Sequence, residues 1–135
     1  MDDQELIDAA SVAREQAYAP YSGYYVGAAL VDESGRVHVG CNVENASFPL
    51  GACAEAGAIS SMVAAGGKKI VAIAAVGGRS ILETCTPCGG CRQRIAEFAD
   101  EYTRILLLDG SDDVVSYRID DLLPNSFRVP ERTST

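Results

Sequence analysis

Positive charge is scarce in this chain of 135 residues. Lys and Arg together number 11 against 19 Asp and Glu, which gives a formal net charge of −8. A protein of this sign repels phosphate backbones and anionic membrane surfaces. We therefore expect no nucleic acid partner, and a small uncharged substrate suits the composition better.

Long apolar runs are also missing. No stretch approaches the roughly 18 apolar residues that a membrane-spanning helix needs. The first residues, Met1 to Glu5, are acidic where a secretory signal is basic and then apolar. We expect a cytoplasmic protein with no membrane association. Its length predicts one domain, over residues 1–127, followed by a frayed tail over residues 128–135.

A disulfide framework is not expected either. The chain has five cysteines, an odd number, and in a reducing compartment thiols serve metal binding or simple burial. A domain of this length buries roughly two-thirds of its unfolded surface, so its core needs no cross-link. The cysteines are therefore candidates for a metal site.

Apolar periodicity and turn residues predict an α/β fold. Small and branched apolar residues dominate the predicted strands, and Pro or Gly ends several of the helices. The predicted elements are helix 3–18, a hairpin of strands 25–31 and 36–41, helix 53–65, strand 70–76, extended 81–85, helix 88–98, strands 104–109 and 114–118, and helix 119–123. The simplest arrangement is a three-layer α/β/α domain with a mixed sheet of about five strands.

Three of the cysteines have the spacing of a metal site. Cys88 and Cys91 are three residues apart at the start of a predicted helix, so their sulfurs fall on one side, and Cys53 begins another helix. Helix N-termini favour thiolates, which bind zinc. Glu55 points away from Cys53 along the helix and suits the open position of a zinc enzyme better than the metal itself. This pattern indicates hydrolysis at a catalytic zinc.

Two other uses of these cysteines remain open at this stage. A structural zinc would be closed by Cys85, His38 or Cys41 as the fourth ligand, but Glu55 would then have no role. A redox-active pair at positions 88 and 91 would leave Cys53 without one.

An ordered set of motifs runs through most of the chain. These are Tyr21-Ser22 with Val26-Gly27-Ala28-Ala29, Gly40-Cys41-Asn42-Val43-Glu44-Asn45-Ala46-Ser47, Cys53-Ala54-Glu55, Pro87-Cys88-Gly89-Gly90-Cys91-Arg92-Gln93 and Leu122-Leu123-Pro124. With this set, which is specific because of its order, the chain from Tyr21 to Phe127 resembles the zinc-dependent cytidine deaminases, specifically the small homotetrameric form with three cysteine ligands.

The resemblance implies a fold, a reaction and a role for each motif. It implies a cytidine deaminase-like fold and zinc-dependent hydrolytic deamination of cytidine or deoxycytidine, with release of ammonia, in pyrimidine nucleoside salvage. Cys53, Cys88 and Cys91 would hold Zn2+, which activates water for attack at C4 of cytosine. Glu55 would carry the protons. The backbone N–H of Ala54 would hold the base O2.

Four further side chains match substrate positions of this family. Asn42 and Glu44 would bind the ribose hydroxyls, although for an Asn and a Glu taken alone an Asx-type turn and a surface acid are the more common roles. Tyr24 takes the place of a phenylalanine that lies against the substrate. Phe127 would reach the pocket of a neighbouring subunit in a homotetramer whose active sites are completed across subunits. Ordinary packing is the alternative for both aromatic residues.

The chain departs from the family beside the catalytic acid. An arginine that donates hydrogen bonds to the thiolates is common there, and this chain has Ala56. Our hypothesis is that a cation from elsewhere, Arg79, Arg92 or Arg94, replaces it.

Gly51 and Gly57 replace larger residues near the site and bear on substrate identity. A modified cytosine nucleoside such as blasticidin S is therefore an alternative substrate. A non-catalytic zinc-stabilised binding protein is a second alternative, which an intact Glu55 disfavours. Cys41 and Cys85 have no assigned role.

Overall fold

The computed structural model describes residues 1–130. Its elements follow the predicted order with one short 3-10 helix added. They are α1 (Asp3–Arg14), β1 (Tyr25–Asp32), β2 (Val37–Cys41), η1 (Phe48–Leu50), α2 (Ala54–Ala64), β3 (Ile70–Gly78), α3 (Gly89–Phe98), β4 (Arg104–Leu108), β5 (Val114–Tyr117) and α4 (Ile119–Leu122). None of the helices in this part of the chain has the length and apolar character that crossing a membrane requires.

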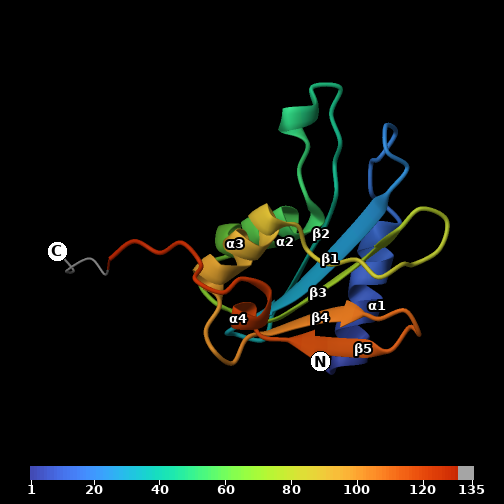
Figure 1. Ribbon diagram of the computed structural model, residues 1–135. Coiled ribbons are helices and arrows are strands. Elements are labelled where there is room, and N and C mark those ends of the chain that lie inside the picture. The colour runs from blue at the N-terminus through green and yellow to red at the C-terminus, as the bar shows by residue number, and fades with distance from the viewer. Residues whose placement is uncertain (131–135) are drawn as a thin grey trace.

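The strands form one mixed sheet between two layers of helices (Figure 1). Its order is β2-β1-β3-β4-β5, with β3 and β4 parallel and the other neighbours antiparallel. Helix α1 packs on one face of the sheet, and α2, α3 and α4 pack on the other. The predicted three-layer α/β/α architecture is confirmed.

Alternation along the strands divides the core between the two faces. Ala28 and Leu30 of β1 pack with α2 and α3, whereas Ala29, between them, packs with Leu6 and Ala10 of α1. Strand β3 is buried along nearly its whole length because both of its faces are covered. The central strands therefore hold the two helical layers at fixed distances from one sheet.

The first helix is shorter than predicted. The first helix ends at Arg14 rather than at residue 18, because the Tyr18 N–H donates to the Asn42 carbonyl oxygen (3.0 Å) and the chain turns toward β2. The predicted extended segment 81–85 makes only an isolated bridge between Glu83 and Gly77. Residues 128–130 contain no helix or strand, and the rest of the predicted tail lies outside the described residues.

A glycine sets the position of α2 on the sheet. A Cβ atom at Gly40 would lie 2.4 Å from the Ala54 carbonyl oxygen and 2.5 Å from the Ala58 nitrogen. Real side-chain carbons do not approach backbone atoms so closely, so only glycine permits this contact. The contact fixes the first turn of α2, immediately after Cys53, against the end of β2.

Candidate metal and active site

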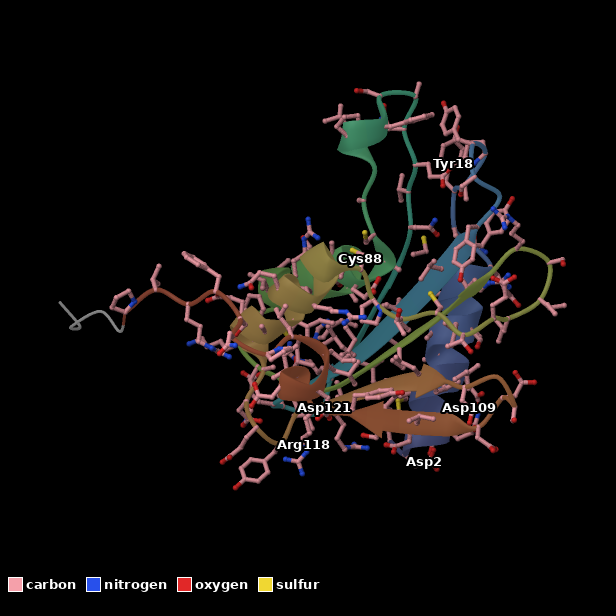
Figure 2. All side chains as sticks on the ribbon, in the orientation of Figure 1. Asp2, Tyr18, Cys88, Asp109, Arg118 and Asp121 are labelled. Atoms are coloured by element: carbon pink, nitrogen blue, oxygen red, sulfur yellow. The ribbon has the colours of Figure 1, made fainter. Side chains whose placement is uncertain are left out.

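Cysteines occupy the starts of two neighbouring helices. Cys53 is the N-cap of α2 and Cys88 is the N-cap of α3, while Cys91 lies in the first turn of α3. The backbone N–H of Cys91 donates to the Cys88 sulfur at 3.4 Å. Figure 2 shows Cys88 where α3 begins beside α2. Both segments therefore lie at helix N-termini, as predicted from the sequence.

The three sulfur atoms form a compact cluster. All lie within 4.8 Å of one another, and the sulfurs of Cys53 and Cys88 are 4.0 Å apart. Zinc bound tetrahedrally at about 2.3 Å from each thiolate would place the sulfurs about 3.8 Å apart. The donor set therefore fits a zinc ion with three protein ligands and a fourth position that no cysteine of the cluster fills.

The thiols of this cluster differ in their ease of ionisation. Burial raises the pKa of Cys91 and that of Cys53, whereas the N–H of Cys91 lowers the pKa of Cys88. Metal ligation requires all three to lose their protons. Cys88 is thus the first available thiolate, and the other two need the charge of a cation.

Glu55 is a buried acid beside the cluster. It lies in the first turn of α2, and only 5% of its surface is exposed. Burial raises its pKa, and the field of Arg94 opposes this rise. Glu55 does not belong to the group that could ligate a metal. An unliganded carboxylate with a raised pKa is suited to taking up and releasing protons.

One cavity joins the sulfurs to the predicted sugar-binding residues. Its volume is about 290 Å³, near the lower end of the range for small-molecule sites. Its lining includes Cys53, Cys88, Glu55 and Ala54 together with Asn42 and Glu44. Val26, which belongs to one of the motifs of the resemblance, and Thr86, which belongs to none, also line it.

The Asn42 side chain links the segment after β2 to the start of β1 through two hydrogen bonds. Its Oδ1 accepts from the Val26 N–H at 2.8 Å, and its Nδ2 donates to the Tyr24 carbonyl at 2.9 Å. These bonds rule out a purely local Asx-type turn. They also leave one amide N–H and one oxygen lone pair for a ligand.

Glu44 is held by the turn before β1. Its Oε1 accepts from the N–H groups of Tyr21 (2.9 Å) and Ser22 (3.1 Å), and its Oε2 accepts from the Ser22 hydroxyl. The Ser22 hydroxyl is the main cause of a lowered pKa for Glu44. The side chain is therefore a fixed, ionised acceptor rather than a free surface acid.

Two predicted substrate residues do not line this cavity. Tyr24 is partly buried, and burial with a contact to Cys85 raises its pKa to about 12. Phe127 has 74% of its surface exposed. Its backbone N–H donates to Gln93 Oε1 (3.1 Å), and its carbonyl accepts from Gln93 Nε2 (2.9 Å). The side chain of Phe127 is thus presented outward from a fixed backbone.

The structure does not support a closed structural site. Among residues 1–130, the only group of possible metal ligands consists of Cys53, Cys88 and Cys91, so Cys85, His38 and Cys41 lie outside it. His38 is instead buried against Asp32, with Nε2 2.8 Å from a carboxylate oxygen. All five cysteines are free thiols.

Comparison with known proteins places the chain in a family. Residues 1–107 match the family described as "Cytidine and deoxycytidylate deaminase zinc-binding region". The chain belongs to this family. A cytidine deaminase from Halalkalibacterium halodurans is 42% identical over 131 residues, which cover 97% of this chain and 98% of that protein.

A solved structure extends the deaminase match to the fold. The cytidine deaminase from Burkholderia pseudomallei superposes with a TM-score of 0.85 at 46% identity, covering 94% of this chain and 100% of that one. A blasticidin-S deaminase from Bacillus cereus is 30% identical over 132 residues, 93% of this chain and 91% of that protein.

Within this deaminase family site, a basic residue does reach the sulfurs. Arg94 Nη1 lies 3.7 Å from the sulfur of Cys91. The spacing of three residues on one helix was the only signal in the sequence, and it did not separate Arg94 from Arg79 or Arg92.

Proposed function

We propose that this protein hydrolyses cytidine or deoxycytidine to the corresponding uridine nucleoside and ammonia, with Zn2+ held by Cys53, Cys88 and Cys91. The observation that carries the proposal is the shared cavity, where the sulfur cluster, a buried acid and two polar side chains meet. When bound, the ion supplies Lewis-acid activation of a water molecule. The remaining steps belong to the protein's own side chains and backbone.

Glu55 is the proton carrier of this proposal. It takes a proton from the attacking water and delivers it to ring N3. It then takes the second proton from the hydroxyl group added at C4, which becomes the carbonyl of the product, and gives it to the departing amino group. Its burial and raised pKa support that role, because both make the protonated carboxyl easier to form than it is for an exposed acid. One water is consumed and one ammonia leaves, and Glu55 returns to its initial state.

The substrate is held by groups around the same cavity. The N–H of Ala54 lies in the first turn of α2, where backbone donors lack helical partners, and it suits the base O2. Asn42 has one free donor and one free acceptor site for a ribose hydroxyl, and the fixed carboxylate of Glu44 accepts from another.

The assembly and setting of the enzyme complete the proposal. Residues 1–127 form the catalytic domain, and the protein acts as a cytoplasmic homotetramer in nucleoside salvage. The exposed Phe127 reaches the cavity of a neighbouring subunit. Tyr24, which is not among the residues that line the cavity, contacts the base of the bound substrate. Exposed apolar residues near the cavity, Phe48 and Leu50, are available for subunit contacts.

A modified cytosine nucleoside is the second candidate substrate. It is favoured by the 30% identity to a blasticidin-S deaminase and by the small residues Gly51 and Ala56 near the acid. The reaction and the roles of the cysteines and Glu55 stay the same. Only the group attached to the base or sugar differs.

A substrate panel tests the proposal. Purified zinc-loaded protein is incubated with cytidine, deoxycytidine, cytosine and blasticidin S, and ultraviolet absorbance follows loss of the amino group. We expect turnover of one or both nucleosides and none of free cytosine, which lacks the sugar. Turnover of blasticidin S alone would select the second candidate, and failure on all four would refute deamination.

A further inference from the structure

The proposed metal site carries an excess of negative charge. One zinc ion and three thiolates sum to about −1, and Glu55 adds a further negative charge whenever it is ionised. Cys88 is exposed, but the inner side of the site is buried, since Cys91 is 0% exposed and Glu55 is 5% exposed. Excess charge in a buried site is costly unless an opposite charge is nearby.

Arg94 is placed to balance this charge. Its Nη1 lies 3.7 Å from the sulfur of Cys91, the most buried of the three proposed ligands. The guanidinium lies close over Gly90, where a Cβ atom would be 3.1 Å from Nη1. The absence of a side chain at position 90 therefore leaves room for this contact.

Other arginines are held by backbone carbonyl groups. Arg92 donates from Nε to the Pro87 carbonyl (2.8 Å) and from Nη1 to the Leu122 carbonyl (2.7 Å), so it braces the chain around α3. Arg14 is bound to the carbonyls of Tyr25 and Gly78. Arg94 takes part in none of the ion pairs found in residues 1–130, so no carboxylate there neutralises it.

Position 56 offers a second place for such a cation. Ala56 is the third residue of α2, three positions after the N-cap Cys53, whose side chain makes no capping hydrogen bond. The side chains of an N-cap residue and of the third helical residue lie near each other, so a basic side chain at 56 would approach the cluster from α2, as Arg94 approaches it from α3. Positions 56 and 94 each lie three residues after a cysteine of the cluster, Cys53 and Cys91 respectively.

We propose that Arg94 is a positioning residue that balances the charge of the thiolate cluster, in place of a cation at position 56. The inference rests on the proposed zinc site at Cys53, Cys88 and Cys91. Arg94 touches neither the substrate nor the metal and acts through the Cys91 sulfur. It stabilises the metal-loaded cluster, because binding exchanges three neutral thiols for a centre of net negative charge.

Zinc release tests this role without reference to turnover. Zinc-loaded wild type and the variants Arg94→Gln, Arg94→Lys and Arg94→Gln with Ala56→Arg are mixed with a chromophoric zinc chelator. Loss of an outer partner of a metal ligand typically weakens metal binding about 10- to 100-fold. We expect release from Arg94→Gln to be at least about 10-fold faster than from wild type, Arg94→Lys to be intermediate, and Ala56→Arg to restore most of the loss.

Cobalt substitution separates charge balance from a general loosening of the fold. A cation beside a thiolate lowers the energy of its lone pairs, so its removal shifts the sulfur-to-cobalt charge-transfer band to longer wavelength. We expect that shift in Arg94→Gln and its reversal in the double variant. Arg79→Gln is the matched control, because Arg79 is exposed in the loop after β3 and should change neither readout.

The outcomes distinguish this inference from the proposed function. Wild-type protein that binds no zinc would refute the metal site itself. Wild-type protein that binds zinc, with Arg94→Gln unchanged in release rate and cobalt spectrum, would overturn the role of Arg94 alone. Faster release that Ala56→Arg does not reverse, with an unshifted cobalt band, would show that Arg94 only supports α3 and would also overturn it.

Discussion

Helix α2 has a buried carboxylate at each end, and the two behave in opposite ways. Glu55 lies in the first turn of α2. Asp32 lies beside Gly67, just beyond the last turn of α2, and a Cβ atom on Gly67 would be 3.0 Å from Asp32 Oδ2. Their exposed fractions are 5% and 0%. Burial raises the pKa of Glu55, while the pKa of Asp32 is held well below its usual range.

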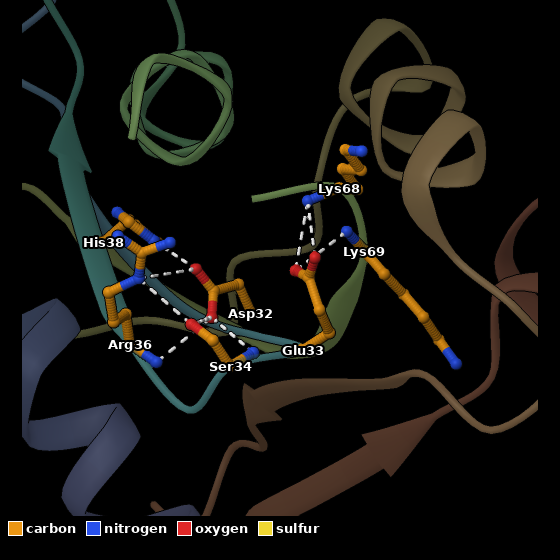
Figure 3. Close-up of polar contacts among 7 residues, drawn as sticks. All are labelled: Asp32, Glu33, Ser34, Arg36, His38, Lys68 and Lys69. Carbon is orange, nitrogen blue, oxygen red and sulfur yellow. Dashed lines mark hydrogen bonds and ion pairs between the residues drawn. The ribbon is translucent and has the colours of Figure 1, made fainter. Parts of the chain in front are cut away.

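Hydrogen-bond donors account for the difference. Figure 3 shows Asp32 at the hairpin between β1 and β2, where it accepts from the hydroxyl and N–H of Ser34 and from the N–H of Arg36. His38 completes the set at 2.8 Å. The Ser34 hydroxyl and His38 are the main causes of the lowered pKa. Glu55 has no comparable set of donors, so its proton remains available for chemistry.

The largest expected effect is at the end of α2 that faces the cavity. Glu55→Gln keeps the shape of the side chain and removes its ability to carry a proton. We expect kcat to fall about 10³-fold or more with zinc content unchanged. Steady-state kinetics and metal analysis of the purified variant check this. A variant that loses zinc along with activity would instead make Glu55 part of the metal site.

The next largest effect is expected at Gly40, whose contact fixes this end of α2. Gly40→Ala forces a Cβ into the backbone of α2, and we expect a loss of about 1–3 kcal/mol in unfolding free energy and weaker zinc retention. Gly57→Ala is the matched control on the facing helix, where the nearest atom to a Cβ is 3.6 Å away. Helix propensity predicts a gain of about 0.5–1 kcal/mol there. Denaturant unfolding compares them, and equal losses would contradict the close-contact argument.

The opposite end of α2 should affect stability and leave catalysis intact. A lowered pKa means that Asp32 stabilises the folded protein above the unfolded-state pKa of about 3.9, and that this contribution is lost as the pH falls below it. Asp32→Asn should therefore lower the melting temperature by several degrees at pH 7 with kcat nearly unchanged. The gap from wild type should narrow below about pH 4. A large fall in the kcat of Asp32→Asn at pH 7 would contradict the view that Glu55 serves catalysis and Asp32 serves stability.

The smallest effect is expected at Cys85, close to the cluster but outside it. Cys85→Ser should retain zinc, whereas Cys88→Ser should lose it, because only the latter supplies a ligand. Metal analysis after dialysis against a weak chelator checks the pair. Zinc release from Cys85→Ser would revive a closed site with four sulfurs.

The order of elements and the pairing of Cys88 with Cys91 were predictable from the sequence because both depend on local spacing. Alternating apolar residues fix which side of a strand is buried, and a separation of three residues places Cys88 and Cys91 on one side of a helical turn. The end of α1 was not predictable in this way, since it depends on a hydrogen bond from Tyr18 to a residue far along the chain. The same holds for Asn42, whose partners lie in β1 and just before it.

The contact of Arg94 shows a different limit. Three arginines were equally plausible from sequence, because a long flexible side chain reaches many directions from its backbone position. Only the packed structure shows that Arg92 is bound to carbonyl oxygens and that Gly90 leaves space for Arg94. Local pattern thus predicts which cysteines lie together, and tertiary packing determines what surrounds them.

Helix α3 carries Cys91 near its start and Gln93 two residues later. The Gln93 side chain forms hydrogen bonds with both the backbone N–H and the carbonyl group of Phe127. One turn of this helix therefore connects the sulfur cluster to the end segment of the chain. A tilt of α3 that opens the cluster must also swing Phe127. In a homotetramer where Phe127 enters a neighbouring cavity, loss of the metal from one subunit would displace the aromatic ring that this subunit places in the cavity of the next.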